Sequence, residues 1–176
     1  PPGVLNVVHG TGSTAGKALV EHPNTTGVGF TGSFSGGRAL WEYANQRETP
    51  IPVFAEMSSI NPVVFLPDTL QKNAAALAKS YAASITMGMG QFCTNPGLLI
   101  AVQNDALDNF LRLLGQEIEG ILPQKMLHSG IHASYHAGLN KALSQKGIER
   151  IAQAAKTPGE GEAFPTVAKV KAEIFL

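Results

Sequence analysis

The sequence predicts an α/β fold with a parallel sheet, and three observations carry this prediction. Short β-branched stretches alternate with helical stretches of about ten residues in the first third of the chain. Turns rich in glycine and serine, at residues 10–16 and 32–37, follow the first two of these stretches. The chain of 176 residues is 44% hydrophobic, which is enough for a sizeable core.

The first part of the chain alternates strand and helix in the order that a parallel sheet requires. Three strands are expected, at residues 4–8, 26–31 and 51–55. Ser13 or Thr14 caps a helix that runs to about Glu21, and the turn at residues 32–37 opens a second helix. Parallel strands need helical crossovers, so this order places both glycine-rich turns at the carboxyl edge of the sheet, where ligands collect.

The pattern changes after Glu56, and a boundary between two parts of the chain is expected near residues 57–61. The elements expected beyond it are a strand between prolines at 61–67, a helix capped by Asp68 or Thr69, a strand at 98–102 buried on both faces, and a helix marked by Leu107, Phe110, Leu111, Leu114 and Ile118. Helical periodicity covers residues 131–155, a loop covers 157–162, and residues 167–176 favour a strand.

Charge and composition exclude several classes of partner. The chain has 13 basic and 13 acidic residues, so it offers no basic patch for a nucleic acid or a membrane surface. No apolar run reaches the roughly 18 residues of a membrane-spanning helix. A single cysteine cannot form a disulfide within the chain, which is typical of a reducing compartment. We therefore expect a cytoplasmic protein that binds neither nucleic acid nor membrane.

The single cysteine, Cys93, lies in a loop between two of the expected apolar segments. Residues 89–97 are rich in Gly, Asn and Pro, which favour exposed turns, and such loops often present catalytic groups. An isolated cysteine is, however, more often a small buried hydrophobic residue than a nucleophile. The loop alone leaves both interpretations open.

The glycine turns and Glu56 each have an ordinary explanation beside a functional one. Gly10, Gly12 and Gly16 approach a dinucleotide-binding pattern, but the last glycine is one place late. The turn at residues 32–37 opens a helix, where backbone N–H groups and the helix dipole favour an anion. Both turns can also be simple tight connections. Glu56 directly follows the third expected strand, where it is either functional or a helix cap or solvated acid.

Three histidines, His128, His132 and His136, are spaced so that a helix would align them on one face. Gly130 and Ser134 interrupt the region, and no carboxylate or thiol partner lies nearby in the sequence. We interpret these histidines as a packed or solvated face and expect no metal site.

Taken together, five stretches resemble the NAD(P)-dependent aldehyde dehydrogenase family. They are Pro2-Gly3-Val4-Leu5-Asn6-Val7-Val8, Gly12-Ser13-Thr14-Ala15-Gly16, Phe30-Thr31-Gly32-Ser33, the region of Glu56, and Gly90-Gln91-Phe92-Cys93. Their order and approximate spacing both match. The family usually has Leu-Gly-Gly after the catalytic glutamate, whereas this chain has Met57-Ser58-Ser59, a form similar to the subgroup that oxidises 2-oxoglutarate semialdehyde (2,5-dioxopentanoate).

The resemblance implies a segment of a longer protein. Residues 1–57, with a partial Rossmann-like parallel sheet, would be the C-terminal part of the NAD(P)-binding domain. Residues 58–176 would be the N-terminal part of the α/β catalytic domain. The family's Glu-x-Phe-Gly-Pro motif would lie beyond Leu176, and its oxyanion-hole asparagine before Pro1. We therefore expect the segment to be inactive alone, and the whole protein to be a homo-oligomer, a dimer or a tetramer.

The resemblance also implies roles for individual residues. Cys93 would be the nucleophile that attacks an aldehyde, and Glu56 the general base that activates the hydrolytic water. Phe92 and Thr94 would shape the pocket for a small-molecule aldehyde. The cofactor would be NADP or NAD, with NADP favoured, and it would contact Gly12, Gly16, Thr31, Gly32, Ser33, Gly36 and Gly37.

Two other functions stay open beside aldehyde oxidation by water. The chain could be a nucleotide-binding α/β segment with an inert Cys93. It could also form the same thioester and pass the acyl group to coenzyme A. Glu56 argues against the coenzyme A hypothesis, because hydrolysis is the step that needs a base.

Overall fold

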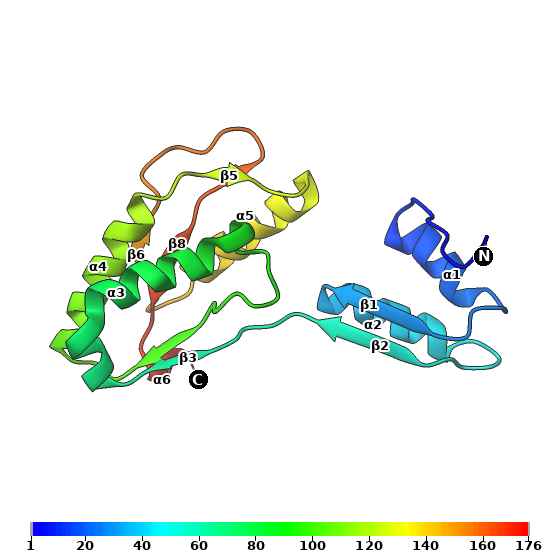
Figure 1. Ribbon diagram of the computed structural model, residues 1–176, viewed down its shortest axis with the longest axis horizontal. Coiled ribbons are helices and arrows are strands. Elements are labelled where there is room, and N and C mark those ends of the chain that lie inside the picture. Colours follow the sequence, from blue (N-terminus) through cyan, green and yellow to red (C-terminus); the bar gives the residue numbers. More distant parts are fainter. Residues whose placement is uncertain (1, 176) are drawn as a thin grey trace. The chain divides into compact units, whose positions relative to one another are not determined.

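The computed structural model describes residues 2–175. The chain divides into two compact units, Pro1–Ser59 and Ile60–Leu176 (Figure 1). The assignment of these units to a cofactor domain and a catalytic domain stays a prediction. Within the described residues, no helix combines the length and the apolar character needed to cross a membrane.

The first unit is built on one parallel pair of strands with a helical crossover (Figure 1). Its elements are η1 (Gly12–Gly16), α1 (Lys17–Glu21), β1 (Val28–Gly32), α2 (Phe34–Asn45) and β2 (Val53–Met57). The strands pair in register from Val28↔Val53 to Gly32↔Met57. The parallel pairing is confirmed, although both strands begin two residues later than predicted.

Helix α2 covers one face of this pair because its small residues admit close packing. A Cβ on Gly37 would collide with the side chain of Met57, and Ala44 is fully buried. Ser33 caps the helix, its hydroxyl oxygen accepting a hydrogen bond from the Gly36 N–H at 3.1 Å. The side chains on the opposite face of the strands, including Phe54, stay exposed.

Residues 4–8 do not form a strand, which corrects the prediction made from their β-branched composition. Val4 and Leu5 are 77% and 84% exposed. A strand requires a hydrogen-bonded neighbour, and the sheet described in this unit consists of β1 and β2 alone. The turn at residues 10–16 therefore has no strand before it, so the expected placement of both glycine turns at one sheet edge is supported only for residues 32–37.

The helix that follows this turn begins earlier than predicted, at Gly12 rather than after Ser13 or Thr14. Its first turn, η1, is π-helical, and the backbone carbonyl of Thr11 accepts from the Ala15 N–H at 2.9 Å. The helix ends at Glu21 as predicted. Neither predicted hydroxyl caps it, because the Thr11 hydroxyl lies 2.9 Å from that of Thr14 instead.

The second unit contains three separate strand pairs. Its elements are β3 (Val63–Phe65), α3 (Pro67–Thr86), η2 (Met87–Gly90), β4 (Leu99–Ala101), α4 (Asp105–Glu119), β5 (Gln124–Lys125), α5 (Ser129–Leu143), β6 (Glu149–Gln153), β7 (Glu162–Ala163), β8 (Thr166–Lys169) and α6 (Ala172–Phe175). Strands β3 and β4 pair in parallel, and the pairs β5·β7 and β6·β8 are antiparallel.

The core of this unit lies between α3 and α4 (Figure 1). Phe110 and Leu70 are buried, and the Phe110 ring meets the ring of Phe65 edge-on with centroids 5.2 Å apart. The predicted apolar stripes on both helices are confirmed as the surfaces that pack here. The core thus joins β3 to the two long helices that flank the cysteine loop in the sequence.

Several predicted boundaries in this unit are wrong for identifiable reasons. Helix α3 begins at Pro67 rather than after Asp68 or Thr69, because proline suits the first helical position, where its missing N–H costs nothing. Strand β4 is not buried on both faces, since Ile100 is 47% exposed. The helical pattern of residues 131–155 ends at Leu143.

Strands β6 and β8 and the short helix α6 occupy the regions where a longer helix and a longer strand were predicted. Gly147, with φ +84°, makes a turn that ordinary residues rarely adopt, and β6 follows it. The strand predicted over residues 167–176 is β8 only as far as Lys169, and α6 follows. Leu176 lies outside the described residues.

Candidate active site

The loop of Cys93 connects η2 to β4 in the second unit, and Cys93 is exposed in it. The chain therefore does not use this cysteine as a small buried hydrophobic residue. Its neighbours Phe92 and Thr94 are exposed as well. The candidate nucleophile, Cys93, and the two candidate pocket residues, Phe92 and Thr94, thus lie in the same exposed loop.

The turn that leads into this loop has an unusual backbone. Gly88, Met89 and Gly90 have φ values of +56°, +63° and +68°, so three consecutive residues are left-handed. A left-handed conformation costs about 1–2 kcal/mol for a residue with a side chain, which here is Met89. A Cβ on Gly90 would also lie only 3.0 Å from the Asn95 amide nitrogen, so both the backbone conformation and the space favour glycine there.

Two side chains fasten the loop to helix α3. The Asn95 amide donates to the carbonyl of Ile85, at 2.9 Å, and to that of Gly90, at 3.1 Å. The Tyr81 hydroxyl donates to the carbonyl of Pro96 at 2.6 Å. Partial burial raises the pKa of the Tyr81 phenol above its ordinary value of 10.0, so the hydroxyl keeps the proton that it donates in this bond to higher pH than a free phenol would.

A third side chain approaches from the segment before β3. The Asn61 amide donates to the carbonyl of Cys93 at 2.7 Å and to that of Asn95 at 3.0 Å. Beside it, the Gly97 N–H donates to the carbonyl of Ile60 at 3.1 Å. Sequence reasoning missed the role of Asn61, because nothing in the pattern of residues 61–67 separates it from an ordinary residue before a strand.

Glu56 lies within β2 rather than after it, as the fourth of the five strand residues. Its partner in register on β1 is Thr31, and both are exposed. Side chains alternate along a strand, so Glu56 shares the face of Phe54, opposite to α2. The candidate base and one predicted cofactor residue therefore stand on adjacent strands of one open face.

The start of α2 suits an anionic group. Ser33 caps the helix, no acidic residue occupies its first turn, and the hydroxyls of Ser33 and Ser35 lie 3.2 Å apart. The first backbone N–H groups of a helix lack intrahelical partners and carry the positive end of the dipole. This donor set fits the diphosphate of a dinucleotide.

The predicted cofactor glycines differ in whether the structure leaves room for a side chain at their positions. A Cβ on Gly36 would lie 3.1 Å from the Phe30 ring, and one on Gly37 would collide with Met57, so packing inside the unit explains both. A Cβ on Gly32 would lie 2.6 Å from the same Phe30 ring. A Cβ on Gly12 would meet nothing within 4 Å, and one on Gly16 would make an ordinary contact. The structure accounts for Gly32, Gly36 and Gly37 without a ligand.

The predicted residues therefore fall into two groups. The first unit holds Glu56, Thr31, Gly32, Ser33, Gly36 and Gly37 around β1, β2 and the start of α2, with Gly12 and Gly16 in η1. The second unit holds Phe92, Cys93 and Thr94 in one loop. Glu56 and Cys93 belong to different units.

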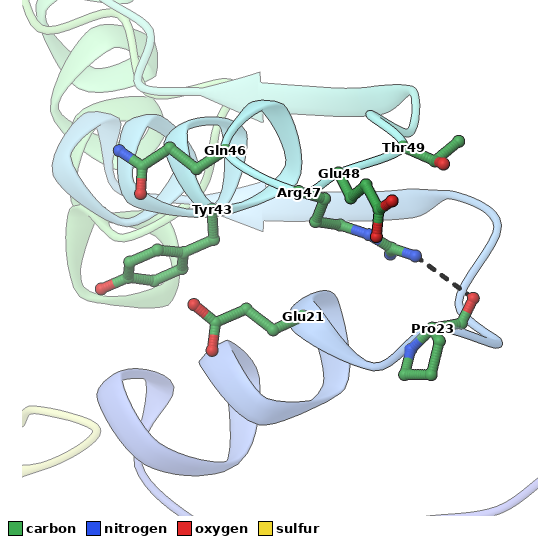
Figure 2. Close-up of a pocket in the computed structure, with 7 residues that line it drawn as sticks. All are labelled: Glu21, Pro23, Tyr43, Gln46, Arg47, Glu48 and Thr49. Carbon is green, nitrogen blue, oxygen red and sulfur yellow. Dashed lines mark hydrogen bonds between the residues drawn. The ribbon is translucent and has the colours of Figure 1, made fainter.

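A hollow of about 420 Å³ in the first unit lies apart from these residues (Figure 2). Its lining is Glu21, Pro23, Tyr43, Gln46, Arg47, Glu48 and Thr49. The Arg47 guanidinium is engaged there, donating to the carbonyls of Val20 at 2.7 Å, Thr25 at 2.9 Å and Pro23 at 3.2 Å. The hollow thus contains none of the predicted site residues, and its one arginine ties the end of α1 to the turn after α2.

The three histidines serve the structure of α5. The His128 ring caps the helix, its Nδ1 accepting from the Gly130 N–H at 3.1 Å. The Nε2 atoms of His132 and His136 lie 3.1 Å apart, and His132 also contacts the carbonyl of Glu162. Within residues 2–175, no group of three or more His, Cys, Asp or Glu side chains is placed to hold a metal ion.

Comparison with protein families decides the family of this chain. The protein-family model described as "Aldehyde dehydrogenase family" matches residues 1–159 of this chain. The chain belongs to the aldehyde dehydrogenase family. The resemblance drawn from five ordered stretches is thereby confirmed.

Two curated relatives match this aldehyde dehydrogenase chain along its whole length. Alpha-ketoglutaric semialdehyde dehydrogenase 2 of Azospirillum brasilense is 42% identical over 176 residues, which is 100% of this chain and 34% of the relative. Alpha-ketoglutaric semialdehyde dehydrogenase of Acinetobacter baylyi is 39% identical over 175 residues, 99% of this chain and 32% of the relative. The chain thus spans about a third of the length of these relatives.

Two solved structures share the fold of this chain. The indole-3-acetaldehyde dehydrogenase AldA of P. syringae, in complex with NAD⁺ and IAA, superposes with a TM-score of 0.83 at 24% identity, over 99% of this chain and 37% of AldA. PnpE in complex with nicotinamide adenine dinucleotide gives a TM-score of 0.78 at 24% identity, over 94% of this chain and 36% of PnpE. The predicted α/β fold of this family is confirmed.

Proposed function

We propose that this chain carries the nucleophile and the general base of an NAD(P)-dependent aldehyde dehydrogenase whose substrate is 2-oxoglutarate semialdehyde. The observation that carries the proposal is its identity of 42% and 39%, over the whole chain, to two relatives named for that substrate. The exposed Cys93 in a braced loop supports it. The whole protein is a homo-oligomer, a dimer or a tetramer.

In the proposed reaction, Cys93 acts as the nucleophile. Its thiolate attacks the aldehyde carbon, a carbon–sulfur bond forms, and the former carbonyl oxygen becomes the oxygen of a thiohemiacetal. The backbone N–H of Cys93 contributes to stabilising the negative charge on that oxygen. Loss of a hydride from the same carbon then leaves a thioester on Cys93.

Glu56 acts in the second half of the reaction. Its carboxylate takes a proton from a water molecule whose oxygen attacks the thioester carbon. The carbon–sulfur bond breaks, the product leaves as a carboxylate, and Cys93 is regenerated. Phe92 and Thr94, on either side of the nucleophile, shape the aldehyde pocket.

The residues proposed to contact the cofactor lie in the first unit. When bound, NAD(P)⁺ supplies the acceptor for the hydride that the thiohemiacetal carbon loses. Ser33 and the first turn of α2 would hold its diphosphate, as their donor set allows. Gly12 has open space above it, which supports a place near the adenosine side. NADP in preference to NAD is part of the proposal.

Two substitutions in the whole protein test the assigned roles. Cys93→Ala should abolish aldehyde-dependent reduction of NAD(P)⁺, because no thiohemiacetal can form. Glu56→Gln should leave a first burst of NAD(P)H of about one equivalent per site and then slow turnover at least a hundredfold, because the thioester accumulates. Stopped-flow absorbance of NAD(P)H separates burst from steady state.

The matched control for Glu56→Gln is Glu42→Gln in the same unit. Glu42 forms an exposed ion pair with Arg38, so its loss should leave both burst and turnover within twofold of the wild type. Normal turnover by Cys93→Ala would remove Cys93 from the mechanism. A Glu56→Gln variant with no burst at all would place Glu56 before the hydride step.

The rival function is a nucleotide-binding segment in which Cys93 is inert. It is favoured if iodoacetamide alkylates Cys93 of the whole protein no faster than a free model thiol, and if NAD(P)⁺ leaves that rate unchanged. Faster labelling that responds to NAD(P)⁺ favours the dehydrogenase.

A further inference from the structure

The Asn61 side chain has an unusual position relative to the Cys93 loop. One amide group donates to two carbonyls two residues apart, those of Cys93 at 2.7 Å and Asn95 at 3.0 Å, from more than thirty positions upstream in the chain. The amide nitrogen carries two hydrogens, enough for one to each of these acceptors. A side chain with this bonding pattern fixes two peptide planes at once.

The backbone around Asn61 is built to hold it there. Asn61 has φ +47°, although it precedes Pro62, where an extended conformation is usual. Its neighbour Ile60 accepts from the Gly97 N–H at 3.1 Å, and the Val63 N–H donates to the carbonyl of Leu98 at 2.8 Å. A left-handed residue between two such anchors is held by its surroundings.

These bonds form one continuous series. Strands β3 and β4 pair through their backbones from Val63↔Leu99 onward, and the bond between Gly97 and Ile60 extends the pairing backward. Beyond that point the backbone of the loop turns away, and the Asn61 amide takes over to reach residues 95 and 93. The hydrogen-bonded strand pair is thereby connected directly to the peptide that carries the thiol.

We propose that Asn61 is a positioning residue, which orients Cys93 by holding its carbonyl. Holding this carbonyl fixes the peptide plane after Cys93 and restricts rotation about its Cα–C bond, on which the direction of the Cα–Cβ bond and the sulfur depends. The proposal rests on the proposed function, in which Cys93 is the nucleophile. Asn61 itself need not touch aldehyde or cofactor.

The exposure of Asn61 and Cys93 predicts that the hydrogen bond between them affects reaction rate more than fold stability. Asn61 and Cys93 are both exposed, so water can solvate a carbonyl that loses its amide partner, and the loss of fold stability should be small. Water cannot, however, tie two carbonyls to the strand pair. A displacement of about 1 Å at a reacting group can slow a reaction about a hundredfold. Loss of Asn61 should therefore affect rate far more than stability.

Two substitutions remove the donor in different ways. Asn61→Asp keeps the shape of the side chain but turns carboxylate oxygens toward two carbonyl oxygens, which repel them. Asn61→Gly tolerates φ +47° and simply lacks the amide. The matched control is Asn104→Gly in the same unit, where Asn104 caps α4 by accepting from the Leu107 N–H at 2.9 Å.

The experiment compares these three variants with the wild type as whole proteins. We measure kcat and the KM for the cofactor in steady state, and amide hydrogen exchange of the peptide covering residues 91–98. Asn61→Asp and Asn61→Gly should lower kcat at least tenfold, leave the cofactor KM within twofold, and speed exchange in this peptide at least tenfold. Asn104→Gly should change neither kcat nor loop exchange by more than twofold.

Each outcome bears on one of the two proposals. A kcat within twofold of the wild type in either Asn61 variant, or an equal fall in Asn104→Gly, overturns the positioning role. A wild type without Cys93-dependent turnover overturns the proposed function instead. In that case faster loop exchange in the Asn61 variants would still show that the amide holds the loop, independently of any aldehyde chemistry.

Discussion

At the scale of single residues, the Cys93 loop is held by hydrogen bonds from side chains to backbone carbonyls. Asn61 and Tyr81 donate to carbonyls of the loop, and Asn95 donates to the Gly90 carbonyl in the turn before it and to the Ile85 carbonyl of α3. A loop without regular secondary structure must satisfy its carbonyls in this way or through water. The position of the thiol is therefore encoded in residues that carry no chemistry of their own.

Tyr81 gives this arrangement a measurable pH dependence. Its pKa is raised by burial, so the folded chain keeps the phenol proton at pH values where the unfolded chain begins to lose it. The contribution of Tyr81 to stability is therefore fully present below pH 10 and is lost as the pH rises above it. Tyr81→Phe should cost about 1 kcal/mol near pH 8 through loss of the bond to Pro96.

The difference between wild type and Tyr81→Phe should narrow as the pH rises past 10. Urea unfolding of both proteins at pH 8 and at two values above pH 10 measures it. A difference that stays constant over this range would contradict the assigned hydrogen bond and its linkage to ionisation.

At the scale of elements, periodicity predicts what is buried better than where elements end. The stripes on α3 and α4 are the faces that pack in the core, because burial follows directly from the spacing of apolar residues. Caps and strand ends depend on which polar group finds a partner. Helix α3, which starts at Pro67 and so already contains both predicted caps, Asp68 and Thr69, illustrates this.

Strands were the least predictable elements. Residues 4–8 have the composition of a strand and none of its hydrogen bonds, while β6 lies where helical periodicity was expected. Strand formation depends on partners distant in the sequence, which local composition does not report. The start of the crossover helix α2 was easier to predict, because a turn rich in glycine and serine marks it in the sequence.

The candidate site could be predicted only in part from the residues. Cys93 and Glu56 stand out by residue type and by resemblance to a family. The φ value of Asn61 and its two bonds to the loop have no sequence signal, because a residue before proline is expected to be extended. The sequence therefore predicts the candidate reactive residues, Cys93 and Glu56, but not Asn61, which holds the loop of Cys93 in the structure.

The helix pair is the element on which the second unit depends most. Phe110 is fully buried and contacts Phe65, so Phe110→Ala should destabilise this unit by about 3–5 kcal/mol. Phe110→Leu, which refills most of the space but loses the ring contact, should cost roughly 1–2 kcal/mol. Chemical denaturation with both variants measures the two costs, and equal costs would show that Phe110 does not fill the core as described.

At the scale of the whole molecule, the chain carries its candidate nucleophile and base in separate units and spans about a third of its relatives. A dinucleotide site needs more contacts than one helix start and a few glycines provide. The donor set at α2 suits a diphosphate, which is only one part of such a cofactor.

The 176-residue chain, purified alone, should therefore reduce NAD(P)⁺ with aldehyde at less than about a thousandth of the rate of the whole protein. Absorbance assays at matched molar concentration, with Cys93→Ala of each as the blank, measure this. Turnover by the isolated chain within tenfold of the whole protein would show that these residues suffice for cofactor binding and catalysis.

The two asparagines that hold the Cys93 loop also bear on how the protein ages. Asparagine deamidates chiefly when the backbone nitrogen of the next residue attacks the side-chain amide and closes a succinimide ring. Asn61 is followed by Pro62 and Asn95 by Pro96, and a proline nitrogen has no hydrogen to lose in that ring closure. Both donors are thereby shielded from slow conversion to aspartate, the change that would turn each of them from a donor into an acceptor.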